Sequence, residues 1–284
     1  MRSAFQKPDL HIHSVFSDGT DAPRQLIAKV RKAGIDLFSL TDHDTAEGCD
    51  EVRRLLGNGD PCFIGGIEFS CEDEKGKYHI LGYGYDEGNV AFRNAVAFGH
   101  RIRMEKLKNR FVFLKEQYGF AFTPEEENRV KSQKNPGKPH FAALMLEKGY
   151  INTKAEGFEI LSGYHGEEEL FLPETAISAI IAADGIPVLA HGILADGSKN
   201  LAAAEIEGRV QRFQKAGLRG LECYYSGYTP EQKRIMLQLA AKNKLLITAG
   251  SDYHGGNKTV RLGDTDGADP KHLEGFYAAV LKRI

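Results

Sequence analysis

The segment from Asp9 to Gly19 reads DLHIHSVFSDG and decides how the rest of the chain is interpreted. Its first residues predict a short buried β-strand, in which His11 and His13 alternate across Ile12. Because successive side chains of a strand point to opposite faces, the two imidazoles share one face. Asp18 follows in a turn. Paired imidazoles with a nearby carboxylate indicate a site for a divalent ion at the end of this strand.

The same arrangement recurs along the chain. The tetrapeptide Thr41–Asp44, Glu68 and His191 each follow a short apolar run that predicts a strand. An H-x-H pair alone is also found at ordinary surface positions, but nine donors at the ends of strands are hard to explain as isolated core or turn residues. The nine predicted metal ligands are His11, His13, Asp18, His43, Glu68, His79, His191, Asp252 and His254.

The composition of this set predicts the kind of metal centre. Six imidazoles and three carboxylates, with no cysteine, suit manganese, iron or zinc. Nine donors exceed the four that one zinc ion takes, so we expect two or three divalent ions, with Glu68 as a bridge. Asp42 and Asp44 are expected either to orient His43 and tune the metal-bound hydroxide, or to cap the following helix.

About seven predicted strands, mostly separated by helices, indicate an α/β fold of the parallel barrel type. Asp21 is expected to cap the helix that follows it, and Gly34 to end that helix. The third strand is expected over 62–67, and a hairpin with the strand at 78–85 is one alternative to a crossover.

The segment from about 90 to 172 lacks a strand pattern. We therefore predict that residues 1–90 and 173–284 form the metal-binding barrel, and that 91–172 form a mostly helical insertion, a cap over the substrate. The basic stretch from Arg101 to Arg110 fits either a nucleic-acid contact or a solvated helix face. The solvated face is favoured because no aromatic residues are interleaved with the basic ones.

Bulk properties restrict the protein class. The chain has 284 residues, of which 42% are hydrophobic and 27% charged, which fits a soluble domain with a sizeable core. A net charge of -2 gives no global attraction to duplex nucleic acid or anionic lipid. Four cysteines without a C-x-x-C pair predict neither a disulfide framework nor a zinc ribbon. Without a signal-peptide pattern or a long apolar run, we expect a cytoplasmic protein with no membrane partner.

Together the motifs resemble the PHP (polymerase and histidinol phosphatase) family, metal-dependent phosphoesterases on a distorted (β/α)7 barrel. The most similar branch removes phosphate from nucleotides, including adenosine bisphosphates, and trims 5′-phosphorylated short RNA. That branch carries D-L-H-x-H-S-x-x-S-D-G, T-D-H-D, G-x-E-[FIL]-S and S-D-[FY]-H-G, which stand here at 9–19, 41–44, 66–70 and 251–255. The resemblance implies hydrolysis of phosphate esters of nucleotides or short 5′-phosphorylated oligonucleotides, such as AMP or a 3′,5′-bisphosphate, by a metal-bridging hydroxide.

The resemblance also implies how the ligands divide among three ions. The first ion would be held by His11, His13, Glu68 and Asp252, the second by Asp18, His43 and His254, and the third by His79 and His191, with Glu68 bridging.

Lys138 and His140, at the start of an insertion helix, are the candidate phosphate-binding residues. In the similar branch an arginine commonly stands at position 138, and lysine keeps the charge but loses the bidentate geometry. An exposed lysine near a helix start is the alternative. His165 is a further candidate, at a position where relatives have lysine or arginine. After His191 relatives continue with proline and arginine, whereas this chain has glycine, isoleucine and leucine.

Two alternatives for the function remain. A histidinol-phosphate-type or other small-molecule phosphatase would use the same ions on a different ester. A non-catalytic, metal-binding PHP module is the alternative from another class, although such modules lose ligands and this chain has all nine.

Overall fold

A sheet of seven strands forms the centre of the protein, in a computed structural model that describes residues 5–195, 199–265 and 267–283. The strand order is β1-β2-β3-β4-β5-β8-β9. These strands are β1 (Pro8–Asp9), β2 (Leu37–Leu40), β3 (Cys62–Asp73), β4 (Gly76–Tyr83), β5 (Ile186–Leu189), β8 (Gly220–Tyr225) and β9 (Leu246–Gly250). A separate small ribbon contains β6 (Leu194–Ala195) and β7 (Lys199–Asn200).

The first and last strands of the sheet meet and nearly close a barrel. The amide of Leu10 donates to the carbonyl of Ala249 at 2.9 Å, and the amide of His13 donates to the carbonyl of Tyr253 at 2.9 Å. The chain beyond β1 therefore continues alongside the chain beyond β9. The α/β barrel is confirmed, and its closure brings the first and last histidine motifs together.

The prediction of a parallel barrel is wrong at β4. This strand pairs antiparallel with both β3 and β5, whereas the other neighbouring strands of the sheet are parallel. Only two residues, Glu74 and Lys75, separate β3 from β4, which is too short for the crossover that a parallel pair needs. The hairpin alternative is confirmed. Because β3 extends to Asp73, Glu68 lies within the strand instead of after it.

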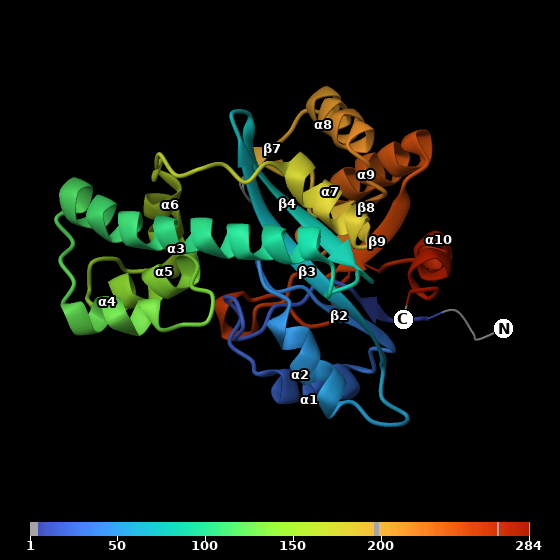
Figure 1. Ribbon diagram of the computed structural model, residues 1–284, viewed down its shortest axis with the longest axis horizontal. Coiled ribbons are helices and arrows are strands. Elements are labelled where there is room, and N and C mark those ends of the chain that lie inside the picture. Colours follow the sequence, from blue (N-terminus) through green and yellow to red (C-terminus); the bar gives the residue numbers. More distant parts are fainter. Residues whose placement is uncertain (1–4, 196–198, 266, 284) are drawn as a thin grey trace.

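Helices cover the outside of the barrel. Figure 1 shows α1 (Pro23–Ala33) and α2 (Glu47–Leu55) together on one side, and α7 (Pro173–Ala182), α8 (Ala203–Lys215) and α9 (Pro230–Asn243) on the other, with α10 (Pro270–Val280) near both termini. Gly34 ends α1 at φ 67°, as predicted. Asp21 does not cap α1, because Ala22 is the N-cap residue. Its carboxylate instead accepts hydrogen bonds from Lys29 Nζ at 2.6 Å and from the Tyr253 hydroxyl at 2.7 Å.

The segment 91–172 contains helices and no strand, as predicted. Its helices are α3 (Val90–Tyr118), α4 (Pro124–Lys131), α5 (Lys138–Glu147) and α6 (Lys154–Ser162). In Figure 1 the long α3 runs from the barrel to α4, α5 and α6, which project away from it. These helices share a buried apolar cluster of their own, which contains Leu107, Phe111, Leu114, Val130, Phe141, Leu144, Met145, Ile151 and Leu161.

The cysteines agree with the expectation from composition. All four are free, and Cys49, Cys71 and Cys223 are buried. Within the described ranges, no helix has both the length and the apolar character that crossing a bilayer requires.

The predicted division into barrel and insertion can be tested at Phe141, which is fully buried in the insertion cluster. Phe141→Ala should lower the free energy of unfolding of this cluster by about 3–5 kcal/mol, because it leaves a cavity. Hydrogen exchange should then accelerate for amides of 107–161 and stay unchanged in β8 and β9. Val112→Ala, on the exposed side of α3 at 51% exposure, is the control. Equal acceleration in both regions would contradict a separately packed insertion.

Candidate metal centre

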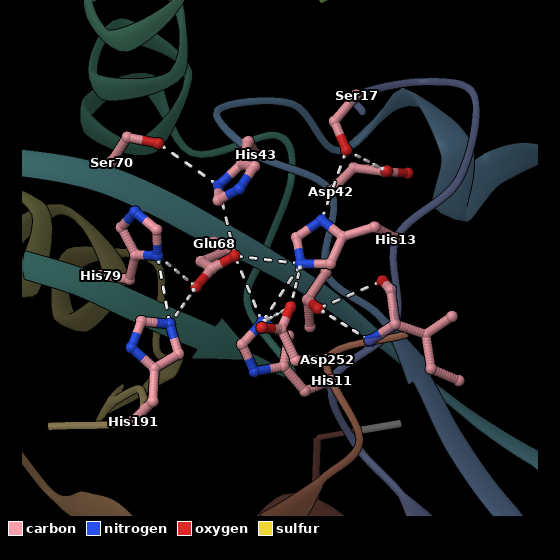
Figure 2. A network of polar contacts seen from close by, with 12 residues as sticks. His11, His13, Ser17, Asp42, His43, Glu68, Ser70, His79, His191 and Asp252 are labelled. Atoms are coloured by element: carbon pink, nitrogen blue, oxygen red, sulfur yellow. Dashed lines mark hydrogen bonds and ion pairs between the residues drawn. The ribbon is translucent and has the colours of Figure 1, made fainter. Parts of the chain in front are cut away.

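Glu68 lies at the centre of the predicted ligands, buried at one end of the barrel (Figure 2). Its Oε2 atom lies 3.2 Å from Nε2 of His11, 3.1 Å from Nε2 of His13 and 3.2 Å from Nδ1 of His43. These histidines come from the two segments that follow β1 and β2, and both segments converge on one oxygen of a residue in β3.

The other oxygen of Glu68 faces a second pair of histidines. Oε1 lies 2.8 Å from Nδ1 of His79, which belongs to β4, and 3.3 Å from Nε2 of His191, which follows β5. The ring nitrogens of His79 and His191 are themselves 3.2 Å apart. The two oxygens of Glu68 thus point to two different sets of imidazoles, as a bridging carboxylate would.

The geometry around Oε2 fits a cation. None of its three close contacts forms a hydrogen bond, although the atom is buried. A buried carboxylate oxygen without a donor is costly. Nε2 of His11 and Nε2 of His13 lie 3.2 Å apart, and both approach Oδ1 of Asp252, at 3.5 and 3.3 Å. Donors held about 2.0–2.2 Å from one tetrahedral ion would lie about 3.3–3.6 Å apart.

Three groups of side chains have ligand atoms within 4.8 Å of one another, the arrangement that holding one ion requires. Asp18 and His254 belong to one of them, and Nε2 of His254 lies 3.1 Å from Oδ1 of Asp18. The groups are His13, Asp18, His43 and His254; His11, His13 and Asp252; and His43, Glu68 and His79. All nine predicted ligands therefore lie in or directly beside one continuous cluster.

Backbone strain is concentrated at this cluster. Asp44, His191 and Asp252 have φ values of 51°, 30° and 57°, in the left-handed region that residues other than glycine rarely adopt. Two of these residues are predicted ligands, and the third lies next to His43. Such strain is typical of functional sites, where the surrounding structure holds the backbone in place.

Charges within the cluster compensate one another. Burial opposes protonation of His13, but Asp252 and Glu68 outweigh this effect and raise its pKa to about 9. Burial also opposes ionisation of Glu68, but His79 and His11 outweigh it and hold the pKa of that carboxyl well below its ordinary value. Without an ion, the cluster thus retains protons that a metal would have to displace.

Sequence reasoning missed Glu222, a carboxylate within β8. Its Oε1 lies 2.9 Å from Nδ1 of His11, and its Oε2 accepts a hydrogen bond from the amide of His191 at 2.8 Å. A carboxylate that holds the far nitrogen of a metal-binding imidazole fixes its orientation and tautomer. The signal in the sequence was one charged residue inside an otherwise apolar strand, GLECYY.

Asp42 and Asp44 do not cap a helix, so that alternative is wrong. The N-cap of α2 is Ala46, and no side chain caps it. Asp42 accepts hydrogen bonds from Ser14 and from the Ser17 hydroxyl at 2.6 Å, and that hydroxyl lies 3.3 Å from Nδ1 of His13.

Asp44 is bound on both of its oxygens. Oδ1 accepts from the amide of Ser70 at 2.9 Å, and Oδ2 accepts from Arg103, on α3. The Ser70 hydroxyl in turn lies 3.3 Å from Nδ1 of His43, so Ser70 links the Asp44 side chain to the His43 ring.

The prediction of a solvated basic face on α3 holds only in part. Arg101 is exposed and pairs with Glu105 and Glu169. The side chain of Arg103 is only 11% exposed, because it points toward the barrel. Charge patterning along one helix could not distinguish these two arginines.

The three predicted substrate-binding residues lie in three different surroundings. His140 lies near the cluster: burial lowers its pKa, and the charge of Asp18 acts in the opposite direction. Lys138 is half-buried, and its Nζ donates to the Ser162 hydroxyl at 3.0 Å. His165 is exposed in the connection between α6 and α7.

Comparison with known proteins agrees with the motifs. The PHP domain profile matches residues 9–164. The chain is 27% identical over 256 residues to a 5′-3′ exoribonuclease of Haemophilus influenzae, which covers 88% of this chain and 90% of the relative. It is also 26% identical over 271 residues to a 3′,5′-nucleoside bisphosphate phosphatase of Chromobacterium violaceum, and the alignment covers 92% of this chain and 92% of the relative. A predicted metal-dependent phosphoesterase of Bifidobacterium adolescentis has a similar structure, with a TM-score of 0.83 and 28% identity over 96% of both chains.

Glu222→Gln should weaken metal binding about 10- to 100-fold, because it removes the charge that holds His11. The measurement is metal content after dialysis against a graded chelator. Glu231→Gln, on the surface of α9 and paired only with Arg234, is the control and should retain wild-type affinity. Wild-type metal retention in Glu222→Gln would contradict the orienting role.

Metal binding should release protons near neutral pH. With a pKa of about 9, His13 carries a proton at pH 7.5 in the metal-free protein, and it must lose that proton to become a ligand. Apparent affinity for Mn²⁺ should therefore rise as pH increases from 6 to 8. Calorimetry in buffers of different ionisation enthalpy measures the release, and a binding enthalpy independent of the buffer would refute it.

Proposed function

The chain belongs to the PHP family of metal-dependent phosphoesterases, and we propose that its substrates are nucleotides or short oligonucleotides carrying a terminal phosphate. It is a hydrolase of phosphate esters. The observation that carries the proposal is the buried set of imidazoles and carboxylates around Glu68. The likeness to a bisphosphate phosphatase and to an exoribonuclease over nine tenths of the chain supports this substrate class.

We assign the ligands to three ions as the family resemblance implies, although proximity alone also places His13 with Asp18, His43 and His254, and His43 with Glu68 and His79. His11, His13, Glu68 and Asp252 would hold the first, Asp18, His43 and His254 the second, and His79 and His191 with Glu68 the third. Nitrogen and oxygen donors suit manganese, iron or zinc. Bound ions would lower the pKa of a water molecule and neutralise the phosphoryl oxygens.

The residues around the ligands prepare the site for this chemistry. Glu222 fixes His11, and the Ser17 hydroxyl, itself held by Asp42, lies against His13. Both histidines are fully buried. Rings fixed in this way need little reorganisation when substrate binds, which favours the transition state.

The insertion supplies the candidate substrate side of the site. A methyl group on Gly137, the residue before α5, would lie 3.3 Å from Oδ2 of Asp18. The start of α5, with Lys138 and His140, therefore lies beside a predicted metal ligand. This placement supports the role of the insertion as a cap over the substrate.

His11→Ala, Glu68→Ala and Asp252→Ala should each reduce turnover at least about 1,000-fold and lower the metal content, since each removes a ligand from the first ion. Phosphate release and elemental analysis on the same samples measure both effects. His272→Ala is the control, because this exposed histidine contacts Tyr224 and lies outside the cluster. Normal turnover in any of the three would refute the ligand assignment.

A substrate panel tests the proposed class. We expect the manganese-loaded protein to release phosphate from AMP, adenosine 3′,5′-bisphosphate or a 5′-phosphorylated dinucleotide in preference to histidinol phosphate and p-nitrophenyl phosphate. Turnover of histidinol phosphate alone would replace the proposal by a small-molecule phosphatase. Bound metal without release from any member would contradict the nucleotide proposal and favour a non-catalytic module.

A further inference from the structure

We infer that Arg103 binds the phosphoryl group of the substrate beside the metal centre. The inference rests on the proposed function, because it assigns a residue to the same site. Arg103 comes from α3 in the insertion and was not among the residues that the sequence motifs pointed to. Its position is defined by three hydrogen bonds and by the surroundings of its remaining nitrogen.

Two nitrogens of the guanidinium are held by the barrel. Nε and Nη2 donate to Oδ2 of Asp44 at 3.0 and 2.7 Å, and Nη2 also donates to the Ser70 hydroxyl at 2.7 Å. A guanidinium has five N–H groups, of which these contacts use three. The two remaining N–H groups are both on Nη1, and they have no partner among the described residues.

Nη1 faces the metal ligands. A methyl group placed on Gly137 would lie 3.2 Å from Nη1 of Arg103 and 3.3 Å from Oδ2 of Asp18. The two remaining N–H groups therefore lie beside Gly137 and close to a predicted ligand. The charge of Arg103 also lowers the pKa of His43 and of His140, although less than burial does, so the guanidinium lies close to both rings.

Gly137 lies in tight contact with this nitrogen. Its backbone is extended, with φ −127° and ψ −174°, which any residue can adopt. Conformation therefore gives no reason for a glycine here, whereas crowding does: a side chain at this position would press on Nη1 and on the Asp18 carboxylate.

A phosphoryl oxygen suits the two N–H groups of Nη1 for chemical reasons. Arginine is the side chain whose planar N–H pairs match phosphate oxygens, and Asp44 holds the plane in one orientation before the ligand arrives. Lys138, in contrast, donates to Ser162. Arg103 therefore supplies the planar donor that lysine at position 138 does not offer.

The test uses inorganic phosphate as the probe on manganese-loaded protein, with binding measured by calorimetry and metal content by elemental analysis. Arg103→Ala combined with Asp44→Asn removes the guanidinium without leaving a buried unpaired carboxylate. Compared with Asp44→Asn alone, which carries the same change beside His43, we expect a 10- to 100-fold higher Kd for phosphate and an equal metal content, the loss expected for a charge-assisted hydrogen bond. Arg103→Lys should fall between this variant and the wild type. Arg101→Ala, two residues away on the same helix, is the control and should bind as the wild type does.

Gly137→Ala separates substrate binding from a merely structural role. It keeps the Arg103, Asp44 and Ser70 side chains and adds a methyl group 3.2 Å from Nη1, a contact tight enough to shift this nitrogen by a few tenths of an ångström. It should therefore weaken phosphate binding while the melting temperature and metal content stay normal. Wild-type phosphate affinity in Gly137→Ala, whether or not the Arg103 variants fold, would overturn the inference. Arginine-dependent phosphate binding without turnover of any nucleotide would refute the proposed function and leave the inference standing.

Discussion

The fold has to keep one buried carboxylate, Glu68, in contact with imidazoles on both of its oxygens. Burial of an ionised carboxylate is very costly unless opposite charges surround it. Here the histidines arrive from the segments after β1, β2 and β5 and from β4, and one of the two oxygens still lacks a hydrogen-bond donor. The demand for a further positive charge at that point explains why this end of the barrel is organised as a metal centre.

Closure of the barrel depends on polar contacts from the same motifs. The Asp9 carboxylate accepts hydrogen bonds from the amide and hydroxyl of Ser251, at 2.9 and 2.7 Å, and burial raises its pKa to about 6. Asp9 precedes His11 and Ser251 precedes Asp252, so the residues that join the two ends of the sheet are neighbours of the ligands. One set of short motifs therefore closes the barrel and positions the metal ligands.

The clustering of the candidate ligands could be predicted from sequence because each lies in a short motif within or next to a strand, where position along the chain determines position in space. Glu222 and Arg103 could not, because each acts through a partner distant in sequence: His11 is 211 residues from Glu222, and Asp44 is 59 residues from Arg103. The direction of β4 was left open for a different reason: the apolar pattern of a strand does not encode the direction of its neighbour.

The short segment of His43 and Asp44 connects the metal centre with the insertion. Arg103 binds Asp44, and the Asn135 side chain donates to the carbonyl of His43. A movement of α3 or of the segment before α5 therefore acts directly on a predicted ligand and on its neighbour. In a barrel capped by a separate structure, the contacts that select a substrate would be independent of those that hold the ions. Here Arg103 and Asn135 of the insertion contact the segment that carries His43, so a change in the insertion also alters how His43 is held.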